Sequence, residues 1–236
     1  MRIGILFSGG KDSAAAIEWA LKNGHTIEWL LSVKPSRKDC YLFHYATVEH
    51  TPTVAQALKL PHELIGCDVA DPAAEAELIR KTMQGLSNVE ALVLGGVGLQ
   101  ETQLASLQNA LKPHSVKVFA AHQKQDHELV LRDLVNRGYL ILITQVAADG
   151  LLPWLGKEIT AANVDALVRD SKKFGFHVGF EGGHADTLVL DAPFFPARIV
   201  PEKVELVVED AYCGHVEIKK LKIEKKQQAV EIKAAF

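Results

Sequence analysis

Short apolar runs alternate with segments of helical periodicity along the first two-thirds of the chain. The apolar runs predict strands at residues 3–7, 26–33, 63–66, 91–94 and 116–119. The segments between them place apolar side chains on one face, as Ile17 and Leu21 do, and predict helices at residues 11–23, 51–59, 72–86, 101–111 and 126–137. This alternation predicts an α/β fold with a parallel sheet and helices on both faces, to which residues 139–143 add a further strand.

The pattern changes at about residue 148. Beyond it, one amphipathic helix is predicted at residues 161–173, and strand-like segments separated by turn residues follow at 188–190, 197–208, 215–224 and 229–232. These elements predict a smaller α+β unit that closes over the cleft at the carboxyl ends of the parallel strands. We therefore predict two domains, an N-terminal one at residues 1–148 and a C-terminal one at 149–236.

The first predicted strand runs directly into the hexapeptide SGGKDS at residues 8–13, which opens a helix. Gly9 and Gly10 can adopt positive φ angles and let an anion approach the backbone N–H groups. Lys11 adds a positive charge, and Ser8 and Ser13 add hydroxyl donors. A strand, a glycine turn and a helix N-terminus with these side chains predict a cradle for phosphate groups.

Asp12 is an unusual neighbour for a polyanion, and it makes sense if it orients Lys11 or helps to hold Mg²⁺. The hexapeptide lacks the spacing of a Walker A loop, G-x-x-x-x-G-K-[ST]. The alternative is a simple glycine turn in which Asp12 or Ser13 caps the helix.

The other strand-end loops should line the same cleft, because parallel sheets bind ligands at the carboxyl ends of their strands. The candidates are residues 32–38, 66–71 and 95–100. Gly95, the first of several glycines in the last loop, could permit close approach of a nucleotide to the backbone. The alternative is a flexible turn after a buried strand.

A second polar cluster lies on a glycine-hinged loop and comprises Glu181, His184, Asp186 and Thr187. This loop follows a strand-like segment at residues 177–180, and it can grip a substrate, with Glu181 accepting hydrogen bonds from a cationic substrate or an ammonium ion. The alternative is a tight hairpin that exposes its carboxylates.

The composition of the chain mainly excludes classes of partner and of protein. The 236 residues carry a net charge of −3, so no global basic field attracts nucleic acid. The three cysteines are scattered, which argues against a disulfide framework and favours the reducing cytoplasm. No secretory segment opens the chain and no apolar stretch approaches the ~20 residues that span a bilayer, so we expect a soluble protein without membrane contact.

The SGGKDS hexapeptide resembles the signature of the PP-loop ATP pyrophosphatases. Within that superfamily, the segments VAADGL (146–151), WLGK (154–157) and EGGHADTLVLDAPFF (181–195) resemble the diphthine–ammonia ligase family, whose pattern has glutamates where this chain has His184 and Asp186. The resemblance implies an adenine-nucleotide alpha-hydrolase-like (PP-loop) ATP-binding domain, followed by a substrate-binding domain.

The resemblance further implies an ATP-dependent ligase that adenylates a carboxylate, releases pyrophosphate and transfers ammonia to the carboxylate. In the family, this carboxylate belongs to diphthine on elongation factor 2. The implied catalytic residues are Lys11, Asp12 and Glu181, with Asp12 at Mg²⁺. The implied ATP contacts are Ser8, Gly9, Gly10, Lys11, Asp12, Ser13 and Gly95.

Two alternatives remain open at this stage. One is a PP-loop enzyme acting on another carboxylate or a tRNA base, and the other is a nucleotide-binding regulator without catalysis. The sequence also leaves open whether the chain forms homo-oligomers.

Overall fold

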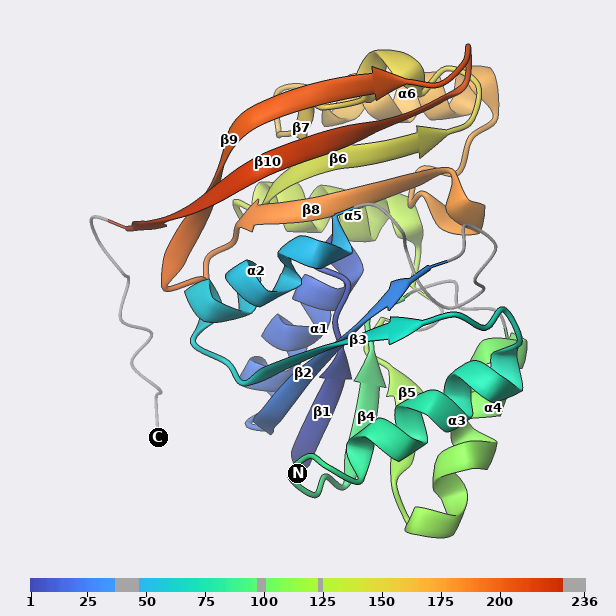
Figure 1. Cartoon of the computed structure of the whole chain (residues 1–236). Coiled ribbons are helices and arrows are strands. Elements are labelled where there is room, and N and C mark those ends of the chain that lie inside the picture. The colour runs from blue at the N-terminus through green and yellow to red at the C-terminus, as the bar shows by residue number, and fades with distance from the viewer. Residues whose placement is uncertain (37–46, 97–100, 123–124, 227–236) are drawn as a thin grey trace.

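A computed structural model describes residues 1–36, 47–96, 101–122 and 125–226. Five parallel strands form a sheet in the order β3-β2-β1-β4-β5 (Figure 1). The strands are β1 (Arg2–Leu6), β2 (Thr26–Pro35), β3 (His62–Cys67), β4 (Ala91–Leu94) and β5 (Lys117–Ala120). All five overlap the predicted strands, so the predicted parallel sheet is confirmed.

Helices cover both faces of this sheet. One face packs on α1 (Lys11–Lys22), α2 (Thr51–Leu58) and α5 (His127–Asn136), and the other packs on α3 (Pro72–Met83) and α4 (Glu101–Leu111). The starts of two helices follow from local chemistry, because Asp71 accepts hydrogen bonds from the first turn of α3 and Asp126 from that of α5. Across the described ranges, no helix is long and apolar enough to cross a bilayer.

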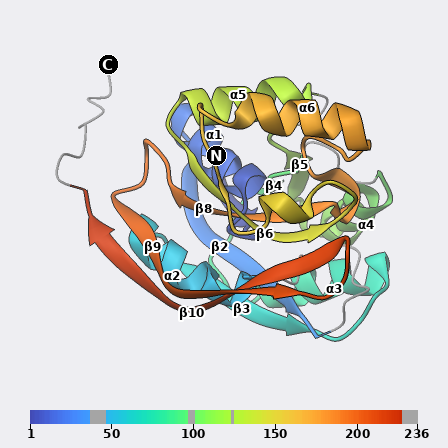
Figure 2. The same ribbon diagram turned by 90° about the horizontal axis from the view of Figure 1, so that it is seen from above.

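The C-terminal part forms a second, antiparallel sheet in the order β7-β6-β10-β9, with β8 on the other edge of β6. Its strands are β6 (Leu140–Ala147), β7 (Glu158–Ile159), β8 (Ala185–Asp191), β9 (Ala197–Val208) and β10 (Cys213–Lys225). Seen from above, α5 and α6 (Val164–Phe174) lie side by side, opposite the β9-β10 hairpin (Figure 2). The strand predicted at 229–232 lies outside the described residues.

Two predicted strands need comment. The strand at 139–143 exists as β6, but it pairs in the antiparallel sheet instead of extending the parallel one. The segment at 177–180 is a turn and not a strand, because Phe180 adopts a left-handed conformation with φ 65° and leads into the 3-10 turn η4 (Glu181–Gly183). The alternative of a tight hairpin at this loop is therefore wrong.

The two sheets share one hydrophobic core. Ile5 of β1, Ile17 of α1, Ile141 of β6 and Leu188 of β8 are fully buried in the same apolar cluster. Because β6 lies on the N-terminal side of residue 148 and yet pairs in the second sheet, the two parts interlock. The domain boundary at residue 148 stays a prediction.

His62 at the start of β3 makes stability depend on pH. Its Nε2 lies 2.8 Å from Ser32 Oγ, which in turn donates to the carbonyl of Phe7, and burial lowers the pKa of His62 from 6.5 to about 4. Between pH 6.5 and about 4, His62 therefore binds a proton in the unfolded chain but not in the folded chain. The free energy of unfolding is thus highest above pH 6.5 and decreases as the pH falls toward 4.

We expect the free energy of unfolding to fall by about 1 to 2 kcal/mol between about pH 7.5 and about pH 4.5 through His62, after allowance for its partial exposure. Urea unfolding at the two pH values measures this loss. His62→Asn keeps a hydrogen-bond donor without a titrating ring. The free energy of unfolding of this variant should therefore lack this pH-dependent loss. An identical pH dependence in the two proteins would contradict the assignment.

Candidate active site

Residues 8–13 form the predicted glycine turn and helix start, shortly after the predicted first strand. Gly9 has φ +81°, and Gly10 is the extended N-cap residue of α1, with no side chain capping the helix. The alternative of a turn capped by Asp12 or Ser13 is therefore wrong. The Ser13 hydroxyl instead donates to the carbonyl of Gly10 at 3.1 Å and accepts from the amide of Ser8 at 3.3 Å, which holds the loop closed.

Lys11 is the buried cation of this loop, with a side chain only 6% exposed. Its Nζ donates to Asp12 Oδ2 at 2.7 Å and to the carbonyl oxygen of Gly179 at 2.7 Å, and it lies 5.6 Å from the ring centre of Phe180. An ammonium group has three donors, so the described partners leave one N–H for a ligand oxygen. The lysine is held in place by a loop far away in the sequence.

Strand β8 also contacts the 8–13 loop. The amide of Lys11 donates to Thr187 Oγ1 at 3.1 Å, and the amide of Val189 donates to the carbonyl of Gly9 at 2.9 Å. Gly10 is close to β8 as well, because a Cβ there would lie 3.1 Å from the carbonyl oxygen of Thr187. The glycine turn is thus clamped between β1 and β8.

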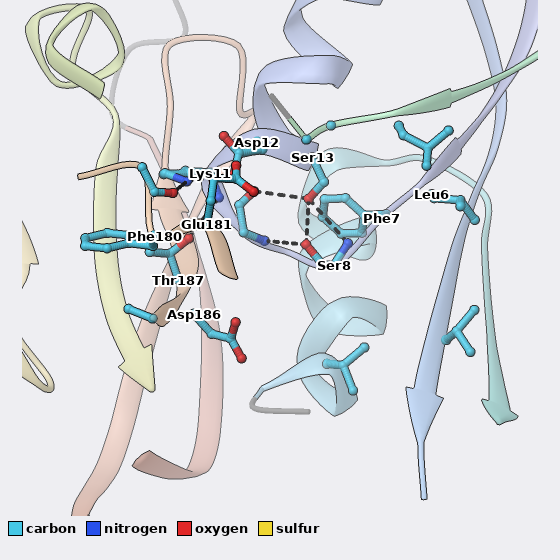
Figure 3. Close-up of a pocket in the computed structure, with 18 of the residues that line it drawn as sticks. Leu6, Phe7, Ser8, Lys11, Asp12, Ser13, Phe180, Glu181, Asp186 and Thr187 are labelled. Carbon is cyan, nitrogen blue, oxygen red and sulfur yellow. Dashed lines mark hydrogen bonds and ion pairs between the residues drawn. The ribbon is translucent and has the colours of Figure 1, made fainter. Parts of the chain in front are cut away.

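A pocket of about 150 Å³ lies between this loop and the C-terminal sheet. Figure 3 shows Ser8 and Ser13 on one side of it and Phe180, Glu181, Asp186 and Thr187 on the other. Of the predicted site residues, Ser8, Gly10, Lys11, Asp12, Ser13, Gly95 and Glu181 line the pocket. Gly9 lies outside the lining and shapes the turn.

The pocket also has walls that the sequence did not reveal. Val48, Gly179 and Phe180 line it, although none of them belongs to a recognisable polar motif. Residues 66–71, all described, lie outside the lining, so the prediction for that strand-end loop is wrong. Of the loop at 32–38, Val33 lines the pocket, whereas residues 37–38, like 97–100, lie outside the described part of the chain.

Gly95 directly follows β4 and lies against the first turn of α1. A Cβ at this position would lie 2.3 Å from the amide nitrogen of Ser13 and 2.4 Å from the carbonyl carbon of Asp12, distances that no side chain can occupy. The close backbone approach predicted for Gly95 is therefore made by the helix start. Contact of Gly95 with a nucleotide remains a prediction.

His177 organises the turn that carries Gly179 and Glu181. Its Nδ1 accepts hydrogen bonds from the amides of Gly179 at 3.2 Å and Glu181 at 3.4 Å. The amide of His177 itself donates to Nδ1 of His184 at 2.8 Å. An Nδ1 that accepts two N–H groups carries no proton, so this geometry requires a neutral ring at His177.

The surroundings of His177 favour that neutral form. Burial lowers its pKa first, and the nearby His127, whose ring centre is 4.5 Å away, lowers it further. His184 and Lys11 act in the same direction, whereas Glu181 raises the pKa. The carboxylate of Glu181 lies 3.7 Å from His127 Nδ1, so an acidic side chain and a histidine meet at the mouth of the pocket.

Two family models match the chain. The model of the diphthamide synthase N-terminal domain matches residues 1–130, and that of the diphthamide synthase C-terminal domain matches residues 126–224. Together they span both sheets and the pocket between them.

Several curated proteins are similar over most of the chain. A Homo sapiens protein named diphthine–ammonia ligase is 28% identical, over 89% of this chain and 86% of its own length. The Mus musculus protein of that name is also 28% identical, over 98% of this chain and 95% of its own length. One from Schizosaccharomyces pombe is 30% identical over 88% of this chain, which corresponds to 37% of that longer protein.

Proposed function

The chain belongs to the diphthamide synthase family, and from that premise we propose that it is an ATP-dependent ligase that joins ammonia to the carboxylate of diphthine on elongation factor 2. The observation that carries the proposal is the clamped 8–13 loop, whose buried Lys11 faces the loop of Glu181 across one pocket. An anion cradle and a polar loop from a separate sheet suit a reaction that joins two substrates.

The proposed chemistry has two steps. An oxygen of the acceptor carboxylate attacks the α-phosphorus of ATP, which expels pyrophosphate and leaves an acyl adenylate. Ammonia then attacks the acyl carbon, loses a proton and expels AMP, which yields the amide. Lys11 and the N-terminus of α1 stabilise the negative charge that grows on pyrophosphate as it leaves.

Asp12 fits a magnesium ion that accompanies the nucleotide. Its side chain is 24% exposed and lines the pocket, and Mg²⁺ usually takes one or two protein carboxylates together with phosphate oxygens and water. No group of three His, Cys, Asp or Glu side chains that could hold a metal ion without a substrate occurs among the described residues. Asp12 would hold Mg²⁺, and the bound ion would offset the negative charge of the phosphate groups.

The proposed role of Glu181 is to act on the nitrogen donor. Glu181 lines the pocket, and its carboxylate lies beside His127. The residue belongs to the turn that holds Lys11. We propose that Glu181 accepts hydrogen bonds from ammonium and removes its proton or positions the ammonia. The ammonium proton then passes to the Glu181 carboxylate or to the neighbouring His127.

Glu181→Gln should lower the rate of amide formation at least about tenfold, a loss of about 1.4 kcal/mol of transition-state stabilisation. ATP affinity should stay within about threefold, because Lys11 and the 8–13 loop remain intact. Calorimetry with ATP and amidation assays on the acceptor measure the two effects. Glu158→Gln, at the exposed position of β7, is the matched control. If both quantities fall together in Glu181→Gln, the glutamate serves the nucleotide site instead.

Product analysis tests the proposed function as a whole. The protein is incubated with Mg-ATP, ammonium and elongation factor 2 bearing diphthine, and the nucleotides are separated by chromatography. We expect AMP and pyrophosphate, formed only when the acceptor is present. ADP would overturn the proposal. AMP formed with another carboxylate or a tRNA but not with diphthine would favour a different acceptor, and ATP binding without turnover would favour a regulator.

A further inference from the structure

His177 lies outside the lining of the pocket beside the 8–13 loop, but it begins the turn that forms one wall of that pocket. The wall consists of Gly179, Phe180 and Glu181. The turn closes where the amide of Phe180 donates to the carbonyl of His177 at 2.8 Å. The His177 ring is therefore bonded to residues that face a ligand without lining the pocket itself.

The backbone of this turn is unusual, and the His177 ring stabilises it. Phe180 adopts the left-handed conformation, with φ 65° and ψ 20°, which is uncommon for a bulky side chain. The amides on either side of Phe180, those of Gly179 and Glu181, both donate to Nδ1 of His177. A strained backbone persists only where its surroundings fix it, and these two hydrogen bonds do so here.

The same turn holds Lys11. The carbonyl of Gly179 accepts a hydrogen bond from Lys11 Nζ at 2.7 Å, and the ring centre of Phe180 lies 5.6 Å from that nitrogen (Figure 3). Neither partner has room to move, because Phe180 is 4% exposed and a Cβ on Gly179 would lie 2.5 Å from Nδ1 of His127. A change in this turn is therefore expected to displace the ammonium group.

Two neighbours fix His177 in turn. Its amide donates to Nδ1 of His184 at 2.8 Å, and its ring meets that of His127 edge-on, with the ring centres 4.5 Å apart. Burial lowers the pKa of His177, which favours the unprotonated Nδ1 that two N–H donors require. The ring thus presents one acceptor to the turn in a fixed orientation.

We propose that His177 is a positioning residue of the active site, whose Nδ1 holds the turn at residues 179–181 so that Gly179 and Phe180 keep Lys11 in place beside Asp12. His177 acts through this turn and not by contact with a substrate. The consequence for ATP turnover rests on the proposed function, whereas the consequence for the Lys11 side chain does not.

Acylation of Lys11 tests the contact without any substrate. The folded protein is treated briefly with acetic anhydride, and mass spectrometry gives the rate at which each lysine is modified. His177→Ala removes the acceptor, so Lys11, 6% exposed in the unaltered protein, should react at least about fivefold faster. His177→Asn places an amide oxygen near the position of Nδ1 and should restore the slow rate. Lys22, 62% exposed, should react equally in all three proteins.

Steady-state release of pyrophosphate tests the consequence for catalysis. His177→Ala should lower ATP turnover about a hundredfold, because a displaced ammonium group stabilises the transition state poorly. His177→Asn should stay within about threefold of the unaltered protein, because the acceptor is kept. Thermal unfolding of both variants is measured as well, since a residue that served the fold alone would change the melting temperature and leave the turnover of each folded molecule unchanged.

Three results would count against His177. Slow acylation of Lys11 in folded His177→Ala, fast acylation in His177→Asn, or normal turnover in His177→Ala would each overturn the inference. If His177→Ala does not fold, nitrogen NMR of the unaltered protein decides: at about pH 7.5, Nδ1 should be unprotonated and coupled through hydrogen bonds to the amides of Gly179 and Glu181, and a proton on Nδ1 would refute the inference. Absence of ATP turnover by the unaltered protein would refute the proposed function, and acylation would still decide the role of His177.

Discussion

Lys11→Ala is expected to lower the rate of ATP turnover about a thousandfold or more, which corresponds to about 4 kcal/mol of lost transition-state stabilisation. Among the described residues, Lys11 is the one lysine or arginine that lines the pocket beside the 8–13 loop. Its Nζ also joins Asp12 to the carbonyl of Gly179. The substitution therefore removes the positive charge that we propose stabilises the leaving pyrophosphate, and it releases the turn that carries Glu181.

The fold should change little in this variant, because the Asp12 carboxylate left behind is 24% exposed and can be hydrated. Steady-state release of pyrophosphate measures the turnover, and thermal unfolding measures the stability. Lys22→Ala, at the exposed end of the same helix, is the matched control. Normal turnover in folded Lys11→Ala would remove the 8–13 loop from the mechanism.

Gly95→Ala is expected to destabilise the protein by about 3 kcal/mol, at the upper end of what overpacking costs. The added Cβ would lie 2.3 Å from the amide nitrogen of Ser13 and 2.4 Å from the carbonyl carbon of Asp12. Both are backbone atoms in the first turn of α1, so the helix start itself must move. Because we propose that this helix start binds the phosphate groups of ATP, ATP affinity should fall about tenfold as well.

Gly66→Ala is the matched control for this substitution. Gly66 also lies near the carboxyl end of a parallel strand, but no atom lies within 4 Å of a Cβ built there. Thermal unfolding should show a melting temperature about 6 to 12 °C lower for Gly95→Ala and nearly unchanged for Gly66→Ala. Equal stability of the two variants would mean that β4 and α1 can separate without cost.

The first half of the fold could be predicted because its determinants are local. A short apolar run bounded by turn residues specifies each strand, and one apolar face specifies each helix. The glycine turn at 8–13 could be predicted for the same reason, since Gly9 supplies the left-handed conformation and Lys11 and Ser13 follow at fixed spacing. These properties depend mainly on residues that are neighbours in the chain.

The assignment of strands to sheets was not local. Residues 139–143 look like one more strand of an alternating series, but β6 bonds to β8 and β10, which come tens of residues later. The turn at Phe180 was missed because its apolar neighbours suggest a strand, whereas the hydrogen bonds that His177 accepts from Gly179 and Glu181 favour a turn.

The sequence by itself determined the glycine turn at 8–13 and the family, because both reside in contiguous residues whose chemistry depends on spacing. Only the tertiary structure decided what surrounds this turn. It brought Gly179 to Lys11, Thr187 to the start of α1 and Gly95 against the same helix turn. The physical reason is that these contacts are fixed by how two sheets share one core, and such long-range packing leaves no periodic trace along the chain.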